Sequence, residues 1–580
     1  MSTEETGTPA ATPAREPVAI GKLMFDHADE IVACLCVAIA VIASWKRLHH
    51  GVDFTDEAFY AAITQRFALG DWPYLDEWNL RQTASLLPVP FYWVFLKVRH
   101  GTDGAVFFLR SLYFGLQILT GLSIFRFAVR RIPRSFAMVA ATLPVVYVPF
   151  GIPTCSYNTL GAMLFAAGSF LGLSALLDDP RPRSFLGAGI VHGLACVGYP
   201  PLAIPVTIFG IAAGYQRYRT REDRTWWRVP ALYVVGLAVI AVLLVLLLLP
   251  GLIHHGVSEA LHYEHMTTQV RSIDKAKDVL RGVVDFAPGG PNGWLGLLGV
   301  VFLLSRSYPR AKGPLLGLLL AYLAWTYSEV QPQYARNVNS LYECIYLGLA
   351  AGFVLLVRGR RPDLFALLLA GWLPSVVAGF ISGFATANVN CVNGGIGIFS
   401  AACLALVAAP AAAEVELLSP LPRAGAVLVL ALVPLGMLSV NMETTYRAGD
   451  TVTHTAVVRT GPYRGIRSAP REVKQVEEMT RSVRAQLEAA GNPERMLSYY
   501  DLPAPYLAAL VRPAMPTVWT DRRAQLHLLL PYYQAHRTGK SIVFVVAGAK
   551  NVSPQLEALA ESGEVLDEKG WFKIYREPMP

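Results

Sequence analysis

Long apolar stretches alternate with short polar connections along most of this chain. Residues 31–45 and 229–249, for example, hold almost uninterrupted apolar side chains. Runs of about 15–20 such residues are long enough to cross a hydrocarbon core of roughly 30 Å. A window of about 19 residues gives about 13 helices of this kind. The pattern therefore predicts a mostly helical, polytopic membrane protein.

The composition supports this prediction, and the charge distribution adds a topology. Hydrophobic residues make up 53% of the chain and charged residues 16%, with a mean hydropathy of +0.40. The net charge of +8 would suit nucleic acid, but the Lys and Arg residues cluster in short connections between spans and not on one amphipathic surface. Counted from a cytoplasmic N-terminus, all of these connections fall on one side: 126–134, 181–183, 217–228, 306–312, 358–361 and Arg423. We therefore exclude nucleic acid as a partner and expect the C-terminus outside the cytoplasm.

Three regions are expected along the chain. Residues 1–28, rich in Thr, Ala, Pro and Glu, should form a disordered cytoplasmic tail, and residues 29–440 the transmembrane domain. Residues 441–580 should form a small extracytoplasmic α/β domain. Within it the pattern predicts a helix at 471–490, strands at 496–500, 541–546 and 571–575, and helical stretches at 505–511 and 523–536.

The first outer segment, residues 46–105, is too long for a simple turn and carries acids just beyond the first span. Asp53, Asp56 and Glu57 would cost desolvation energy at a membrane boundary unless something uses them. Helical spacing from Asp56 onward places Asp56 and Tyr60 on one face of a short helix, which we expect to lie on the membrane surface. Asp56 could then act as a general base toward an acceptor hydroxyl. Alternatively, Asp53 is a helix N-cap, and Asp56 and Glu57 are first-turn acids that complement the helix dipole.

Three motifs in this segment resemble the first periplasmic loop of the glycosyltransferase C superfamily. They are Asp56-Glu57-x-x-Tyr60-Ala61, Gly70-Asp71-Trp72 and Pro88-Val-Pro90-Phe-Tyr92-Trp93. The likeness covers about residues 53–93 and is greatest to the bacterial lipid A aminoarabinose transferases and the protein O-mannosyltransferases. It implies the superfamily's membrane fold, Asp56 as catalytic base, and Glu57 as an aid to acceptor or metal binding. It also implies a donor sugar linked to a polyprenyl phosphate.

The sequence departs from the superfamily pattern at two places. Leu87 stands where the superfamily has a Lys before the proline pair, and the nearest polar residues upstream are Ser85, Gln82 and Arg81. At the expected outer start of the fourth span, many relatives carry an acid where this chain has Asn158. An asparagine can hydrogen-bond a sugar hydroxyl, but it cannot serve as a base or a strong metal ligand.

A departing lipid phosphate needs a cation, because negative charge accumulates on its oxygen. Arg336, which follows Tyr334 just before a late span, matches the superfamily's Arg at that place, and a guanidinium suits bidentate phosphate contact. Arg81 is the second candidate. Alternatively, Arg336 is a headgroup anchor at the interface, or Glu343 simply neutralises it.

The outer segment His262-Tyr-Glu264-His265 has metal-ligand residue types at helical spacing. Such a pair of histidines more often lies on a solvated juxtamembrane face, so we assign no metal site. A divalent metal is left open as a cofactor.

We interpret the chain as a glycosyltransferase of the bacterial inner membrane. It would move a sugar from a polyprenyl-phosphate donor to a lipid, glycan or protein hydroxyl by one inverting displacement, with membrane lipids around it. Tyr60, Asp53, Gln82 and Tyr334 would help Arg81, Asn158 and Arg336 to bind substrate. Two alternatives are a flippase for lipid-linked saccharides and an inactive glycolipid-binding relative. A flippase predicts internal symmetry between the halves, which the pattern does not show.

Overall fold

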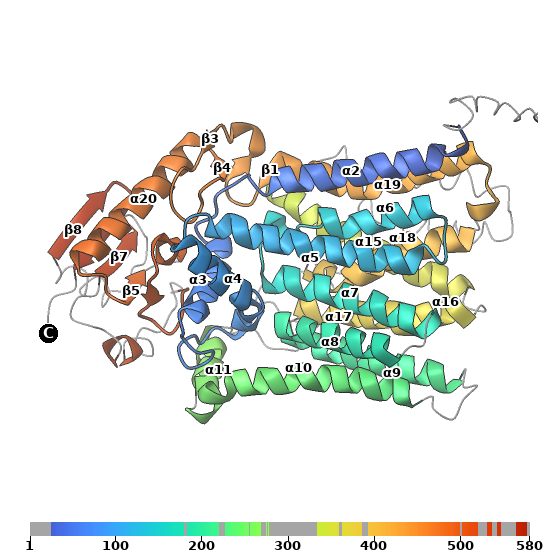
Figure 1. Ribbon diagram of the computed structural model, residues 1–580, viewed down its shortest axis with the longest axis horizontal. Helices are drawn as coiled ribbons and strands as arrows, with labels where there is room; N and C mark the ends of the chain where they lie inside the picture. The colour runs from blue at the N-terminus through green and yellow to red at the C-terminus, as the bar shows by residue number, and fades with distance from the viewer. Residues whose placement is uncertain are drawn as a thin grey trace, which may run out of the picture.

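A computed structural model describes residues 25–178, 182–219, 227–254, 256–267, 333–358, 362–384, 393–413, 415–498 and 502–519. It also describes Asp274, Lys277 and the segments 531–535, 542–546 and 564–576. Long helices run side by side in a bundle, and the C-terminal strands gather at one end of it together with α3 and α4 (Figure 1).

The bundle helices agree with the predicted membrane class. They are α2 (Ala28–Arg47), α5 (Ala105–Ala128), α6 (Arg134–Val146), α7 (Tyr157–Leu177), α8 (Pro182–Gly198), α9 (Ala203–Arg219), α10 (Arg228–Ile253), α15 (Gln333–Arg358), α16 (Pro362–Ala366), α17 (Leu373–Phe384), α18 (Gly394–Ala413) and α19 (Pro420–Glu443). Seven described helical segments are long and apolar enough to cross a membrane, and three shorter ones are also apolar. The count of about 13 stays a prediction, because most of residues 268–332 lie outside the described part of the chain.

Small residues bring neighbouring bundle helices close together, as is usual between membrane helices. A side chain at Gly189 of α8 would meet the carbonyl oxygen of Tyr233 on α10 at 2.2 Å. One at Gly397 of α18 would meet the carbonyl of Ala378 on α17 at 2.1 Å. The outer face of α10 exposes apolar side chains such as Val242 and Leu246, which suits contact with lipid.

The predicted basic connections that the structure describes lie at the end of the bundle opposite the C-terminal strands. The turn from α5 to α6, the C-terminal ends of α7, α9 and α15, and the N-terminal ends of α8, α10 and α16 are all at that end (Figure 1). Ion pairs between neighbouring helices stabilise this end of the bundle. Asp178 lies 2.5 Å from Arg131, and Asp29 at the start of α2 lies 2.9 Å from Arg423 at the start of α19.

The first loop contains α3 (Asp56–Ala68), η1 (Leu80–Leu86) and α4 (Val89–Arg99). The predicted helix is present and begins at Asp56, but it has no exposed face from Glu57 to Phe67, since every one of these residues is buried within the protein. The reason is that the C-terminal region covers it: the Gln65 amide donates to the carbonyls of Tyr506 and Ala509, at 2.7 and 2.9 Å. The neighbouring helix α4 exposes apolar side chains instead, namely Phe91, Trp93, Val94 and Val98.

The C-terminal region holds α20 (Pro470–Ala489) and a five-stranded sheet of order β6-β5-β7-β9-β8. The strands are β5 (Arg495–Ser498), β6 (Arg512–Pro513), β7 (Ile542–Val546), β8 (Glu564–Lys569) and β9 (Phe572–Arg576). Strand β5 pairs in parallel with β6 and β7, whereas β7, β9 and β8 pair antiparallel. The predicted helix and three strands are confirmed, while β6 and β8 were not predicted. The predicted stretch 505–511 is a 3₁₀ helix, η9 (Ala504–Ala508), and of 523–536 only 531–535 is described, as helix.

Two short hairpins connect α19 to α20. They pair β1 (Thr444–Thr445) with β2 (Gly449–Asp450) and β3 (Ala456–Val457) with β4 (Arg467–Ser468).

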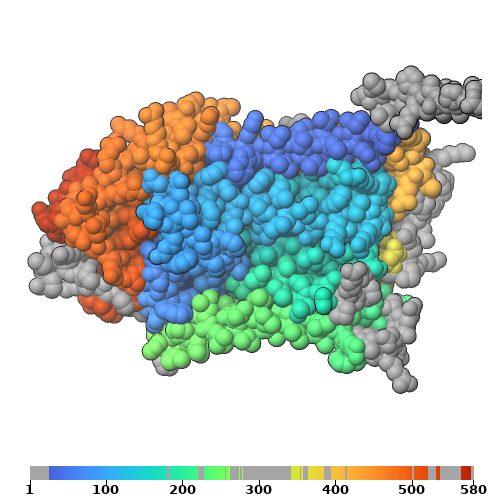
Figure 2. Space-filling model, in the orientation of Figure 1, coloured from blue at the N-terminus to red at the C-terminus, as the bar shows by residue number. Residues whose placement is uncertain are grey.

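A second hydrophobic core joins the first loop to the C-terminal region. It contains Phe59 and Ile63 of α3 together with Tyr463, Met479 and Tyr506, all buried. Figure 2 shows the C-terminal region seated against the first loop on the face in view. The N-terminus of α3 is therefore held between the bundle and the C-terminal region.

Candidate active site

Asp53 organises the start of α3. Its Oδ1 accepts hydrogen bonds from the backbone N–H and hydroxyl of Thr55, at 2.9 and 2.6 Å. Its Oδ2 accepts from the backbone N–H of Glu57 at 2.8 Å. These are the bonds of a helix-capping carboxylate, which satisfies donors that the first turn leaves unpaired. The N-cap position itself is Thr55 and not Asp53 as the alternative expected, but the side chain of Asp53 performs the capping role from two residues earlier.

Glu57 forms a buried ion pair with Arg110 of α5. Arg110 donates from Nε to Oε1 at 2.7 Å and from Nη2 to Oε2 at 2.6 Å, and both side chains are buried. The remaining N–H groups of Arg110 point at the carbonyls of Leu48, His50 and Gly51, at 2.7 to 3.0 Å. Both oxygens of Glu57 thus have a donor, and the pair joins α3 to α5 and to the end of α2.

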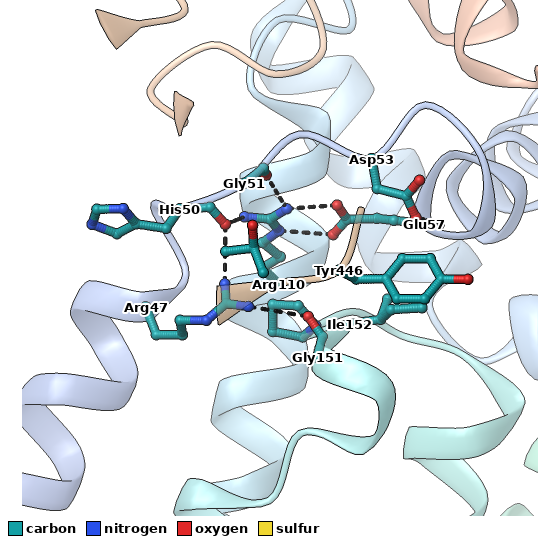
Figure 3. Close-up of a pocket in the computed structure, with 11 residues that line it drawn as sticks. Arg47, His50, Gly51, Asp53, Glu57, Arg110, Gly151, Ile152 and Tyr446 are labelled. Carbon is teal, nitrogen blue, oxygen red and sulfur yellow. Dashed lines mark hydrogen bonds and ion pairs between the residues drawn. The ribbon is translucent and has the colours of Figure 1, made fainter. Parts of the chain in front are cut away.

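A second buried guanidinium, that of Arg47 at the end of α2, lies beside this pair. It donates to four backbone carbonyls: Asn441 at 2.5 Å, His50 at 3.0 Å, Gly151 at 3.1 Å and Thr444 at 3.3 Å. Figure 3 shows both guanidinium groups around a small opening, with about 200 Å³ of space between its lining atoms, part of it open to solvent. Because their N–H groups already have acceptors, these arginines stabilise the junction of the segments around them.

Asp56 differs from its two neighbours. Its side chain is 27% exposed, and its Oδ2 accepts a 2.7 Å hydrogen bond from the hydroxyl of Tyr446. The guanidinium of Arg447 lies 3.2 Å from the same oxygen. No described residue donates to Oδ1 of Asp56. One oxygen of this carboxylate is therefore held while the other can take a proton.

Two titratable groups near Asp56 have displaced pKa values. Burial raises the pKa of Asp53 to about 6, and the charge of Asp56 adds to the effect, although hydrogen bonds from Thr55 and Glu57 oppose it. Burial and then the charge of Arg47 lower the pKa of His50 to about 4, so this imidazole is neutral at physiological pH. The charged groups beside Asp56 at neutral pH are thus the carboxylate of Asp53 and the guanidinium of Arg447.

Tyr60 lies one turn along α3 in a group of aromatic rings. Its ring centroid is 5.9 Å from that of Tyr157, which stacks on Tyr199 at 5.8 Å. The guanidinium carbon of Arg81 lies 5.5 Å from the Tyr157 centroid, within the range of a cation–π contact. Asn158 follows Tyr157 in the first turn of α7 and is half-buried. The structure thus brings Tyr60 and Arg81 together around Tyr157, and Asn158 is the next residue along α7.

The side chain of Gln82 hydrogen-bonds only to backbone groups of the first loop among the described residues. Its Oε1 accepts from the backbone N–H of Tyr74 at 3.2 Å, and its Nε2 donates to the carbonyl of Glu77 at 2.7 Å. The side chain is fully buried. Its amide therefore shapes the loop before η1.

The other predicted candidates lie outside the described side chains. Tyr334 and Arg336 belong to α15, whose described side chains begin at Leu341. His262, Glu264 and His265 belong to α11 (Gly256–Thr267), whose described side chains end at Leu261. Within the described part of the chain, no group of three or more His, Cys, Asp or Glu side chains is arranged to hold a metal ion.

The sequence analysis missed Arg110, Tyr446 and Arg447. Arg110 had a signal, since a lone Arg in the apolar run 105–116 must find a partner. Tyr446 and Arg447 had none, because 390 residues separate Tyr446 from Asp56 and no local pattern connects them.

Comparison with known proteins gives structural similarity only. No family model and no curated protein sequence matches the chain. The Archaeoglobus fulgidus oligosaccharyltransferase tethered with an acceptor peptide is 14% identical, with a TM-score of 0.45 over 89% of this chain and 69% of that one. The same organism's AglB, in complex with an inhibitory peptide and a dolichol-phosphate, is 13% identical, with a TM-score of 0.45 over 91% and 70%. ArnT from Cupriavidus metallidurans, bound to undecaprenyl phosphate, is 15% identical, with a TM-score of 0.36 over 96% and 98%.

These solved structures belong to the superfamily that the first-loop motifs resemble. Identities and TM-scores of this size do not assign an activity, so the function rests on the chain's own residues.

Proposed function

We propose that this chain is a membrane glycosyltransferase that moves a sugar from a polyprenyl-phosphate donor to an acceptor hydroxyl, with Asp56 as the general base. The end of the bundle that carries α3 and the C-terminal region would face the periplasm of a bacterial inner membrane. The described basic residues at the opposite end, such as Arg131 after α5 and Arg134 at the start of α6, support this orientation, since Lys and Arg are enriched in cytoplasmic connections.

The observation that carries the proposal is the difference among three neighbouring carboxylates. Asp53 uses both oxygens to cap α3, and Glu57 uses both to hold Arg110. Asp56 alone of the three is partly exposed and has an oxygen to which no described residue donates. Proton transfer needs an accessible, charged carboxylate, so Asp56 fits a general base best.

The reaction is a single displacement at the anomeric carbon of the donor sugar. The acceptor oxygen attacks this carbon while its proton passes to Asp56. The bond from the anomeric carbon to the phosphate oxygen breaks, and its electron pair leaves with the lipid phosphate. Attack opposite the leaving group inverts the anomeric configuration.

The other predicted residues would bind the substrates. Arg336 or Arg81 would stabilise the departing phosphate by its positive charge. Tyr60, Tyr334 and Asn158 would contact the sugar. Glu57, Asp53 and Gln82 would keep the first loop in shape around it, through the hydrogen bonds described above.

The test is sugar transfer from a radiolabelled polyprenyl-phosphate sugar in membranes that contain Asp56→Asn. A matched control is Asp103→Asn, because Asp103 lies in the same loop, is 31% exposed and pairs with Arg484 of the C-terminal region at 2.6 Å. Loss of a general base typically costs about 10²–10⁴-fold in rate. We expect a loss of this size for Asp56→Asn, with normal membrane insertion, and near-normal transfer for Asp103→Asn.

Full transfer by Asp56→Asn would overturn the assignment of the base. Equal losses in both variants would show that carboxylates between the first loop and the C-terminal region are needed only for folding. That result would also overturn the assignment of Asp56 as the base.

A further inference from the structure

The C-terminal region reaches Asp56 through the turn of the β1–β2 hairpin. Tyr446 and Arg447 follow β1 directly, and both contact Oδ2 of Asp56. Besides its contact with Asp56, Arg447 donates from Nη1 to the hydroxyl of Thr55 at 2.6 Å. Its guanidinium also lies over the Tyr446 ring, 5.1 Å from the centroid. The two residues thus hold the first turn of α3 at adjacent positions.

The hairpin itself is fixed to the end of the bundle. The strand β1 continues directly from α19, and the carbonyl of Thr444 accepts from the buried Arg47. Thr445 packs so tightly on Gly51 that a Cβ at Gly51 would lie 2.7 Å from the Thr445 Cβ. Arg447 has a φ of 56°, a left-handed conformation that costs a non-glycine residue energy and persists only where its surroundings hold it.

We infer that Tyr446 and Arg447 are positioning residues for the proposed base. Asp56 accepts the proton efficiently only when these two residues of the β1–β2 hairpin contact its carboxylate. This inference rests on the proposed function and extends the active site into the C-terminal region. Tyr446 orients the carboxylate by donating to Oδ2, which leaves Oδ1 for the acceptor proton. Arg447 holds the same oxygen from a second direction, through its guanidinium at 3.2 Å.

The need for a cation follows from the charges that face Asp56. On its own segment these are the carboxylate of Asp53, and further along α3 the neutral phenol of Tyr60. From the hairpin they are the phenol of Tyr446 and the guanidinium of Arg447. Above pH 6 Asp53 is largely charged and repels a second negative charge beside it. Arg447 is the described cation in contact with Asp56 that offsets this repulsion.

The phenol of Tyr446 remains a donor throughout the working range. Burial and then the charge of Asp56 raise its pKa above the usual value. This phenol can therefore keep donating to Oδ2 of Asp56, as the proposed role requires.

The experiment measures kcat and KM separately for sugar transfer by the full-length protein in membranes. Its variants are Arg447→Gln, Arg447→Lys and Tyr446→Phe, with Arg484→Gln as control, because Arg484 makes the equivalent pair with Asp103. We expect Arg447→Gln and Tyr446→Phe to lower kcat with little change in KM, by less than the loss of about 10²–10⁴-fold expected for Asp56→Asn. Arg447→Lys should restore most of kcat, because it keeps the positive charge, and Arg484→Gln should keep the wild-type kcat.

The outcomes separate this inference from the proposed function. A wild-type kcat in Arg447→Gln and Tyr446→Phe, with Asp56→Asn inactive, would overturn the positioning role and leave the base in place. Activity in Asp56→Asn would overturn the base itself. A loss of transfer in Arg447→Gln that comes with a lower melting temperature and is not rescued by Lys would show a purely structural role and also overturn the inference.

Discussion

Arg110 meets Glu57 with two parallel hydrogen bonds, Nε to Oε1 at 2.7 Å and Nη2 to Oε2 at 2.6 Å, and both side chains are shielded from solvent. The pair connects the first turn of α3 to the first turns of α5. It also leaves Asp56, one residue earlier, as the acid of this turn that is partly exposed.

Loss of either partner of this pair should destabilise the fold. In Glu57→Ala the guanidinium of Arg110 keeps its charge without its counter-ion, and breaking a buried pair in this way typically costs about 3–5 kcal/mol. Arg110→Ala should cost a similar amount, and the double variant less than the sum of the two. The measurement is the free energy of unfolding of the purified protein in detergent. Additive effects, or a wild-type stability in Glu57→Ala, would contradict the pairing.

Arg47 should matter for stability through hydrogen bonds alone. Its guanidinium satisfies carbonyls of the segments at Gly151, Asn441 and Thr444, which come from distant parts of the chain. Arg47→Met keeps the length of the side chain and leaves these acceptors unpaired, at a cost of about 1–3 kcal/mol for each group that stays dry. Lys46→Met is the control, because Lys46 is the exposed neighbour at the same helix end. Melting temperatures should fall clearly for Arg47→Met only, and equal shifts would argue against the bonding role.

Gly51→Ala should disturb the β1–β2 hairpin, whose turn contacts Asp56. Gly51 has a φ of 84°, and its missing side chain makes room for Thr445. Gly70→Ala is the matched control, since Gly70 has a φ of 99° but no atom within 4 Å of the position of a Cβ. Backbone strain alone should cost each variant about 1 kcal/mol. Only Gly51→Ala should show a larger loss of stability together with reduced sugar transfer, and equal effects in both variants would show that the contact with Thr445 is unimportant.

Local patterns in the sequence were enough to find the elements of the site but not their surroundings. The helix at Asp56 and the strands at 496–500 and 571–575 follow from residue periodicity, which depends on neighbours along the chain. The burial of α3 does not, because its cause is the row of carbonyls at Tyr506, Ala509 and Val511 that accept from Gln65 more than 400 residues earlier.

The roles of the three acids also depend partly on local sequence and partly on contacts between distant residues. The sequence offered both a capping role for Asp53 and a catalytic role for Asp56, and the two are compatible because different residues perform them. Nothing in the spacing showed that Arg110 would form its ion pair with Glu57. By sequence alone, Asp53, Asp56 and Glu57 could each have been its partner.

Glu77 should make the junction between the first loop and the C-terminal region sensitive to pH. Its Oε2 accepts from Arg66 and from the backbone N–H of Val518, both at 3.2 Å, and its side chain is fully buried. Burial raises the pKa of Glu77 to about 7, although Arg66 and the N–H groups of Asn79 and Val518 act in the opposite direction.

The sign of the effect follows from proton binding. Between pH 4.5 and 7 the unfolded chain has released the Glu77 proton while the folded protein still holds it, so the folded state binds more protons. The stability that this group contributes is therefore present below pH 4.5 and is lost as the pH rises through 7, by up to about 3 kcal/mol. Glu77→Gln keeps the shape but cannot titrate. The melting temperature of the wild-type protein minus that of Glu77→Gln, measured from pH 5 to pH 8, should therefore fall up to about pH 7 and then level off. A difference that grows with pH would mean that Arg66 holds Glu77 in its charged form, and it would contradict a raised pKa for this carboxyl.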